Sequence, residues 1–258
     1  MMGEERREKI IELLKNDGRV IVKELAEIFD VSLDSIRRDL TILEQQNKLK
    51  KTYGGAIPSL KVRTSPKPES ERYKDPSPSL DAISKTAAEC FIKENDTIFI
   101  GAAGIQFGMI KHLPTNIKLT VITNSIVIAN KLKDFENIDT LLIGGIINSS
   151  GSITDTISID FIKNFVIDVC FVTGGGISKR GITTASPQGA SFTRTICQIS
   201  RERVCLAPSY KIGVDMFAHA APLELIDSII LDPEAPSEFI NYVNNSNINI
   251  KIAHVDSL

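Results

Sequence analysis

The 258-residue sequence is poor in the residues that metal sites and nucleophilic triads need, because it contains only three histidines and four cysteines. The histidines, His112, His219 and His254, are far apart in the chain. The residue pattern therefore supports neither a metal centre nor a histidine-based catalytic triad. We expect a protein without a metal ion or a cofactor.

The four cysteines, Cys90, Cys170, Cys197 and Cys205, show no CxxC or other metal-ligand spacing. They sit in apolar surroundings such as VCFV and VCLA, which is typical of core thiols. We interpret all four as reduced residues in the core of a cytoplasmic protein, since disulfides are rare in that compartment.

The chain also lacks an apolar run of membrane-spanning length, and its start, MMGEERREKI, is charged and helical rather than a secretion signal. We expect a cytoplasmic protein with no membrane partner. Apolar residues make up 42% and charged residues 24%, which suits one large or two ordinary globular domains. The net charge of −2 gives no global indication of nucleic-acid binding, so that function has to rest on local charge.

Residues 1–57 show the periodicity of short helices. Apolar residues recur at helical spacing in two runs, Ile10, Leu13 and Leu14, then Val22, Leu25, Ala26 and Phe29. Asp30-Val31-Ser32 breaks the pattern, and Ser32 is a candidate N-cap for a third helix that runs to about Asn47. On a helical wheel, the apolar and polar residues of this helix fall on opposite sides: Ile36, Leu40 and Leu43 against Arg37, Arg38, Thr41 and Gln45.

The third helix is followed by NKLKKTYGGAIP, in which Gly54-Gly55 predicts a tight turn between two short extended pieces. Three helices and a hairpin are the plan of a winged helix-turn-helix, whose third helix enters the major groove of DNA. Residues 35–51 contain five Lys/Arg and two Asp/Glu, a local charge of +3. Charge alone is equally compatible with a solvated basic face in a protein-binding module.

Residues 58–78 contain five prolines and almost no apolar periodicity, which predicts a linker. From residue 79 onward short apolar strands alternate with helices. The predicted strands are 97–101, 119–124, 140–145, 169–175, 203–207 and 228–231, and the predicted helices are 79–93, 125–133, 187–200 and 234–245. This alternation favours an α/β domain over residues 79–258, with a mostly parallel sheet covered on both faces.

Parallel sheets bind ligands at the carboxyl ends of their strands, where loops lead into helices. Glycines and hydroxyl or amide side chains gather at those ends here, and Lys211 could neutralise a phosphate. The candidate effector contacts are Gly101, Ala102, Ala103, Gly104, Thr123, Asn124, Ser125, Gly144, Gly145, Gly174, Gly175 and Lys211. For any single loop, an ordinary strand-to-helix turn is the alternative, but four such loops favour a small phosphorylated ligand.

The run from Gly18 to Ala56, GRVIVKELAEIFDVSLDSIRRDLTILEQQNKLKKTYGGA, closely resembles the helix-turn-helix signature of DeoR-family bacterial transcription regulators. It departs from the family pattern only at Ser35, Asn47 and Lys51, which stand for threonine, glycine and arginine. The resemblance implies a DNA-binding surface made by Ser32, Ser35, Arg37, Arg38, Thr41, Gln45, Lys48, Lys50, Lys51, Thr52, Tyr53, Gly54 and Gly55.

The second half resembles the sensor domain of the same family through LTVITNS, LLIGG, VCFVTGGGIS and LAPSYKIG. The resemblance implies a fold shared with ribose-5-phosphate isomerases and an effector such as a phosphorylated sugar. Acidic residues common in the family are replaced by Gly101, Gly189 and Pro208, whereas Lys211 is kept. Because glycine and proline can neither move a proton nor accept hydrogen bonds from sugar hydroxyls through a carboxylate, we expect no catalysis.

Together these features predict a DNA-binding repressor of carbohydrate or related metabolism, which binds operator DNA as a homo-oligomer, a dimer or a tetramer. An enzyme acting on sugar phosphates, with the winged helix as an accessory module, is the alternative. A protein-interaction scaffold is a third possibility.

Overall fold

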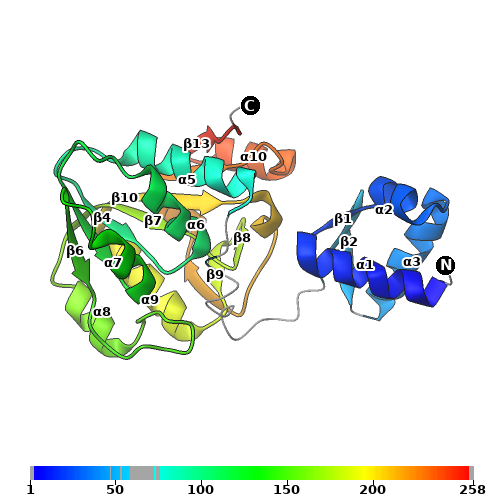
Figure 1. The fold of residues 1–258 in the computed structure, drawn as a ribbon, viewed down its shortest axis with the longest axis horizontal. Coiled ribbons are helices and arrows are strands. Elements are labelled where there is room, and N and C mark those ends of the chain that lie inside the picture. The colour runs from blue at the N-terminus through cyan, green and yellow to red at the C-terminus, as the bar shows by residue number, and fades with distance from the viewer. Residues whose placement is uncertain (1–2, 47, 53, 59–72, 74–75, 256–258) are drawn as a thin grey trace. The chain divides into compact units, whose positions relative to one another are not determined.

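The computed structural model describes residues 3–46, 48–52, 54–58, 73 and 76–255 (Figure 1). The chain forms two compact units, Met1–Lys61 and Val62–Leu258, which are considered separately below. Most of the predicted linker, residues 59–72 and 74–75, lies outside the described residues, as do Asn47 and Tyr53.

The first unit contains the predicted helices and hairpin. Its elements are α1 (Gly3–Asp17), β1 (Val20–Ile21), α2 (Val22–Phe29), α3 (Leu33–Gln45), β2 (Leu49–Thr52) and β3 (Gly55–Pro58). The hairpin strands β2 and β3 pair antiparallel, and β1 adds a third strand on the other side of β3. The two-residue strand β1 was not predicted, because it is too short to show a sequence pattern.

The apolar stripes of the three helices form one core. Ile36, Leu40 and Leu43 of α3 are each at most 1% exposed, and they pack with residues of α1, α2 and the hairpin. The N-cap of α3 is Ser32, whose Oγ accepts a hydrogen bond from the Ser35 backbone N–H at 3.2 Å. The predicted helix start and the predicted buried face are therefore both confirmed.

The second unit is built on a seven-stranded sheet in which every neighbouring pair is parallel. The strand order is β13-β12-β10-β7-β4-β5-β6. The strands are β4 (Thr97–Ile100), β5 (Leu119–Thr123), β6 (Ile138–Leu142), β7 (Ile167–Val172), β10 (Ser200–Ala207), β12 (Ser228–Leu231) and β13 (Asn249–Ile252). The α/β fold class with a parallel sheet is thus confirmed.

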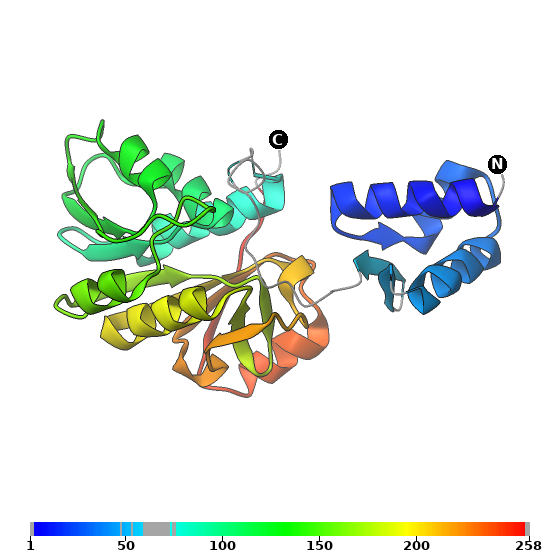
Figure 2. The same ribbon diagram turned by 90° about the horizontal axis from the view of Figure 1, so that it is seen from below.

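Helices cover both faces of this sheet (Figure 2). One face packs against α5 (Pro78–Phe91), α6 (Gly104–Gly108), the 3₁₀ helix η1 (Met109–His112) and α7 (Ile126–Leu132). The other face packs against α8 (Thr156–Ile162), α9 (Pro187–Ile199) and α10 (Ser237–Asn244). In β4, Ile98 and Ile100 point into the first layer and Phe99 into the second, as the two-residue period of a strand requires.

A small antiparallel sheet in the order β11-β9-β8 packs on the α9 side and was not predicted. Its strands are β8 (Gly176–Ser178), β9 (Gly181–Thr184) and β11 (Ala218–Ala221), and two short 3₁₀ helices, η2 (Ser209–Lys211) and η3 (Leu223–Leu225), lie nearby in the chain. Helices α6 and α8 and strand β13 were also not predicted.

The expectation for the cysteines is right for three of the four. Cys170, Cys197 and Cys205 are buried, and burial raises the pKa of the Cys205 thiol to about 12. Cys90 is exposed, so the prediction of a core position is wrong there. The buried residues of α5 include Ala87, Ala88 and Phe91, and Cys90 lies outside this buried stripe. Among the described residues, no helix is long and apolar enough to cross a membrane.

Candidate DNA-binding surface and effector site

The exposed face of α3 carries the two adjacent arginines. Arg37 donates from Nη1 to Asp34 Oδ1 at 3.0 Å, in an ion pair whose partners are both mostly exposed. Arg38 is also exposed and makes no hydrogen bond or ion pair with the residues that the structure describes. The surface therefore offers one guanidinium in a weak solvent-exposed pair and one that is available to a ligand.

The wing is tied to α3 through Lys51 of β2. Lys51 Nζ donates to Thr41 Oγ1 at 2.8 Å, and the Lys51 backbone N–H donates to Glu44 Oε1 at 2.8 Å. Thr41 Oγ1 in turn donates to the Arg37 carbonyl oxygen at 2.8 Å. These contacts hold the hairpin beside the outward face of the helix.

Both acidic residues of the basic stretch 35–51 are engaged within the unit. Glu44 accepts from Lys51, and Asp39 is only 3% exposed. The Asp39 carboxylate accepts from Arg6 Nε at 2.6 Å and from Arg7 Nη1 at 3.1 Å, both on α1. Because Asp39 is buried against α1, it adds no exposed negative charge to the surface that this stretch presents.

Most of the other predicted DNA contacts are exposed, namely Ser32, Gln45, Lys48, Lys50, Thr52 and Gly54, and Ser35 is half-buried. Gly55 is buried and pairs with Ile21 of the neighbouring strand β1. A Cβ atom at this position would lie 1.8 Å from the Val20 carbonyl oxygen, so close approach of the backbone requires glycine. Tyr53 lies outside the described residues.

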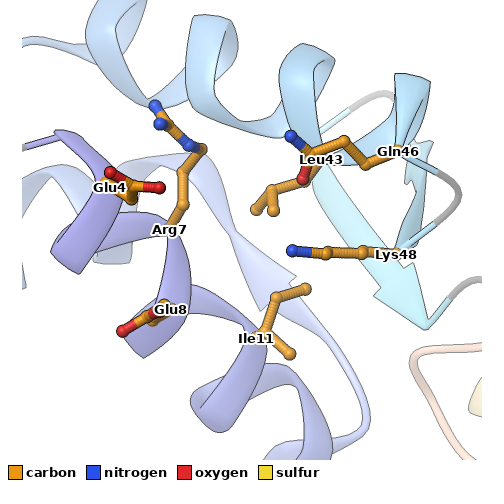
Figure 3. A pocket seen from close by; sticks show the side chains of 7 residues that line it. All are labelled: Glu4, Arg7, Glu8, Ile11, Leu43, Gln46 and Lys48. Atoms are coloured by element: carbon orange, nitrogen blue, oxygen red, sulfur yellow. The ribbon is translucent and has the colours of Figure 1, made fainter.

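Lys48 points into a hollow of about 430 Å³ between α1 and α3 (Figure 3). The other residues that line this hollow are Glu4, Arg7, Glu8, Ile11, Leu43 and Gln46. Charges of both signs face it, so the hollow itself has no preference for a polyanion.

In the second unit, the candidate effector contacts follow five neighbouring strands, β10-β7-β4-β5-β6, at one edge of the sheet. Strands β5 and β6 are added to the sheet on one side of β4, whereas β7 and β10 are added on its other side. The direction in which successive strands are added therefore reverses between β4 and β7. This switch point is where open parallel sheets bind ligands. The structure thus brings all the predicted segments to one edge.

The loop after β4 is closed by Gln106. Its Oε1 accepts from the Ala103 backbone N–H at 3.1 Å, and its Nε2 donates to the Phe171 carbonyl oxygen of β7 at 2.5 Å. Gln106 is 4% exposed. A Cβ atom at Gly101 would lie 3.1 Å from this side chain, so Gly101 gives Gln106 the space to bridge β4 and β7.

The loop after β5 is rich in buried polar groups. Thr123 Oγ1 accepts from the Ser125 backbone N–H at 3.2 Å, and Ser125 Oγ caps α7 by accepting from the Ile128 N–H at 3.3 Å. Asn124 donates from Nδ2 to the Ile153 carbonyl oxygen at 3.0 Å. Asn124 is only 4% exposed, and its Oδ1 is buried. This oxygen accepts no hydrogen bond from the described residues. An unmet buried acceptor costs on the order of 1–3 kcal/mol.

The carboxyl ends of β7 and β10 are joined by Lys211. Lys211 Nζ donates to Thr173 Oγ1 at 3.1 Å, and Thr173 Oγ1 donates to the Leu206 carbonyl oxygen at 2.7 Å. Close packing requires glycine at position 174, since a Cβ atom there would lie 2.5 Å from the Thr183 carbonyl oxygen. Gly175 is exposed.

The loop after β6 carries the exposed Gly144 and Gly145. Gly145 has φ +144°, a conformation that favours glycine, and the Asp155 carboxylate lies against it. Asp155 accepts from the Ile146 backbone N–H and caps α8 by accepting from the Ser158 N–H. Burial acts to raise the pKa of Asp155, but these hydrogen bonds outweigh it and hold the pKa below its usual value.

Three residues at this edge of the sheet were not among the effector contacts predicted from the sequence. Asp232, after β12, is buried and accepts from the Ser209 N–H at 2.7 Å, which fixes the loop that carries Lys211. No sequence pattern marked Gln106 as a residue that joins two strands. Tyr73 hydrogen-bonds with Ser125, and its only sequence signal was its place as an aromatic residue in a proline-rich segment. In the described parts of the chain, no three His, Cys, Asp or Glu side chains cluster in a way that could hold a metal ion.

A winged helix-turn-helix and a parallel α/β domain with polar loops at one sheet edge define the class of DNA-binding regulators with a sensor domain. The family comparisons agree with both halves. Residues 6–59 match the DeoR-like helix-turn-helix domain, and residues 81–233 match the DeoR C-terminal sensor domain. The chain belongs to the DeoR family of transcriptional regulators.

Relatives are similar along nearly the whole chain. The HTH-type transcriptional regulator GolR of Listeria innocua is 31% identical, over 96% of this chain and 98% of its own. The HTH-type transcriptional repressor GlcR of Bacillus subtilis is 30% identical, over 99% and 98%. The glycerol-3-phosphate regulon repressor of Escherichia coli is 28% identical, over 98% and 100%. These relatives are named as regulators and not as enzymes, in agreement with the expected absence of catalysis.

Among solved structures, ribose 5-phosphate isomerase A from Neisseria gonorrhoeae is similar over 56% of each chain, with a TM-score of 0.39 and 16% identity. The eIF2B beta subunit from Chaetomium thermophilum is similar over 58% of this chain and 47% of its own, with a TM-score of 0.40 and 14% identity.

Proposed function

We propose that this regulator is a repressor of genes for carbohydrate or related metabolism, with its DNA reader in residues 1–57 and its sensor in residues 79–258. The observation that supports operator binding most strongly is the exposed pair Arg37 and Arg38 on α3, beside a wing tied to the same helix by Lys51. Arginine side chains on such a helix can bond guanine edges or phosphates, and the wing lysines can contact the DNA backbone.

The sensor is proposed to bind a small phosphorylated metabolite at the switch-point edge of the sheet. Lys211 supplies a positive charge there, and buried Asn124 Oδ1 supplies an acceptor for a ligand hydroxyl. The predicted backbone contacts at Gly101–Gly104, Gly144, Gly145, Gly174 and Gly175 complete the proposed site. A phosphate ester with free hydroxyls matches both groups, and one relative is named a glycerol-3-phosphate regulon repressor.

Isomerase-type chemistry is not part of the proposal. Gly101, Gly189 and Pro208 stand where the resembling family has acidic groups, and none of them can transfer a proton. Gly189 lies in the first turn of α9, where its N–H donates to Ser186 Oγ at 3.1 Å. The residues at this edge are suited to recognition rather than turnover.

The repressor is proposed to act as a homo-oligomer, since one winged domain contacts little DNA and duplicated half-sites supply the usual affinity. The sensor also exposes large apolar side chains close together in the chain: Ile146 (67%), Ile157 (61%) and Val166 (63%). Light scattering of the purified chain tests this directly. A monomeric wild type would contradict the proposed homo-oligomer, and an Ile157→Lys variant with an unchanged mass would show that these apolar side chains do not form its interface.

Two measurements test the main proposal. Binding of the full chain to its own promoter fragment should be lost when Arg37 and Arg38 are both changed to alanine, with the fold retained by circular dichroism. A thermal-shift screen of sugar phosphates and sn-glycerol 3-phosphate should find a compound that stabilises the wild-type chain. Unchanged DNA binding contradicts the operator proposal, and a screen without a stabilising compound contradicts the effector proposal.

A further inference from the structure

Tyr73 lies between the DNA reader and α5 in the chain, in the segment that the sequence assigns to a linker. Its hydroxyl is 3.0 Å from Ser125 Oγ, in the loop after β5. The same hydroxyl donates to the Ala102 carbonyl oxygen at 3.3 Å, in the loop after β4. Its ring packs against Phe107 of α6, with the two centroids 4.9 Å apart. One side chain of the connecting segment thus contacts two of the loops that form the proposed effector site.

These contacts are made with groups that a ligand would also use. Ser125 is fully buried, and its Oγ already accepts from the Ile128 N–H. The next residue in the chain toward the strand is Asn124, whose Oδ1 is the buried acceptor without a partner among the described residues. A bound phosphate ester that takes a hydrogen bond from Ser125 or from the Tyr73 hydroxyl must therefore rearrange the Tyr73 contacts.

We propose that Tyr73 is a positioning residue that links occupancy of the effector site to the chain segment leading to the DNA-binding domain. This inference rests on the proposed effector function. The hydrogen bonds of the Tyr73 hydroxyl depend on the positions of the loops at Ala102 and Ser125. The contact with Phe107 keeps the ring at that edge of the sheet. A ligand that changes these contacts changes how the sensor holds the segment, which gives the two sites a physical route for coupling.

The first test needs neither DNA nor ligand. Arg72 and Lys74 flank Tyr73, so the rate of trypsin cleavage at these two bonds reports how firmly Tyr73 is held. Tyr73→Phe removes the hydroxyl and keeps the ring, and Ser125→Ala removes its partner. Each should raise the cleavage rate of the full chain about fivefold, the ratio given by a net hydrogen-bond contribution of about 1 kcal/mol. Because both changes break the bond between Tyr73 and Ser125, the increase in cleavage rate of the double variant should be smaller than the product of the two single increases.

Tyr242→Phe is the matched control, since its hydroxyl makes a single hydrogen bond among the described residues, to the Lys179 carbonyl oxygen at 3.4 Å. It should be cleaved at the wild-type rate. Thermal unfolding of every variant shows whether the sensor is still folded. If Tyr73→Phe is cleaved like the wild type, or if Tyr73→Phe and Ser125→Ala act additively, the proposed link is overturned.

The second test uses sn-glycerol 3-phosphate and each sugar phosphate of the screen as probes. A compound that stabilises the wild type should change its cleavage rate at Arg72 and Lys74, and most of that change should be lost in Tyr73→Phe. An equal change in both proteins overturns the link while leaving the effector site intact. If no compound stabilises the wild type, the effector proposal fails and the link fails with it, and the cleavage results then describe a purely structural anchor.

Discussion

The carboxylate of Asp39 accepts a hydrogen bond from Arg6 Nε at 2.6 Å, so α3 and α1 are joined by an ion pair 33 residues apart in the chain. Asp39 immediately follows Arg37 and Arg38, yet it is turned into the unit while they face outward. Arg7 adds a second contact to the same carboxylate. The ion pair sets how α3 lies on α1, and hence how the two outward arginines are presented.

Replacing Asp39 with alanine should destabilise the DNA-binding unit by about 3 kcal/mol, because it leaves the partly buried side chains of Arg6 and Arg7 without their carboxylate partner. A unit of this size has only a few kcal/mol of stability, so we expect a large loss of folded winged helix. Asp34→Ala is the matched control on the same helix, since its pair with Arg37 is exposed and contributes at most about 1 kcal/mol. Urea unfolding followed by circular dichroism compares the two, and equal losses would contradict the structural role of Asp39.

Arg38→Ala should weaken operator binding more than Arg37→Ala. Arg38 has no partner among the described residues, whereas Arg37 must first give up its contact with Asp34. A lost base contact costs about 1–3 kcal/mol, which corresponds to roughly 5- to 150-fold in affinity. Lys9→Ala on α1 is the control for a general loss of positive charge. Fluorescence anisotropy over a range of salt concentrations measures the effect, and a larger loss from Arg37→Ala would reverse the proposed ranking.

The two wing glycines should respond differently to alanine. At Gly55 the added methyl would lie 1.8 Å from the Val20 carbonyl oxygen, so β1 or β3 has to move, at a cost of at least about 2 kcal/mol. At Gly54 the added methyl meets nothing within 4 Å, so this variant should keep the stability of the wild type. Thermal unfolding of the DNA-binding unit distinguishes the two. Equal stability of both variants would show that β1 does not hold Gly55 as described.

The sequence predicted best what depends on neighbouring residues. The period of Ile36, Leu40 and Leu43 marked the buried face of α3, because the helical repeat is a local property. The apolar strands gave the parallel sheet for the same reason, and carboxyl ends of parallel strands share one edge. The positions of the candidate effector loops therefore followed from the strand predictions alone.

Contacts between distant segments could not be predicted in this way. The partners of Asp39 come from α1. Gly174 is required because the backbone of β9 lies too close for a side chain. Tyr73 stood in a segment without periodicity, so nothing local tied it to Ser125. Cys90 was misjudged because the apolar residues Phe91 and Ile92 follow it in the chain, but its own side of α5 is exposed.

Asp155 should make part of the sensor's stability depend on acidic pH. Its pKa in the folded chain is lowered from the ordinary value of 3.8, despite burial, by hydrogen bonds from the Ile146 and Ser158 backbone N–H groups. The folded chain then binds fewer protons than the unfolded chain, so this contribution is complete above pH 3.8 and is lost as the pH falls through the lowered native pKa. Asp155→Ala should cost about 1 kcal/mol near neutral pH and progressively less in acid. A difference in unfolding free energy that stays constant with pH would contradict this assignment.

Lys211→Met should separate effector recognition from DNA recognition. The substitution keeps most of the aliphatic length but removes the ammonium group that now donates to Thr173. A charge-assisted hydrogen bond to a phosphate contributes about 1.5–3 kcal/mol, so the affinity for a stabilising sugar phosphate should fall roughly 10- to 150-fold. Lys163→Met on α8 is the matched control, because Lys163 is exposed and pairs only with Asp160 among the described residues. Isothermal titration measures the loss, and promoter binding by the ligand-free variant should equal that of the wild type, because the substitution lies in the sensor. Undiminished affinity for the phosphate ester would remove Lys211 from the proposed site, whereas a loss of ligand-free promoter binding would assign it to the repressor's structure instead.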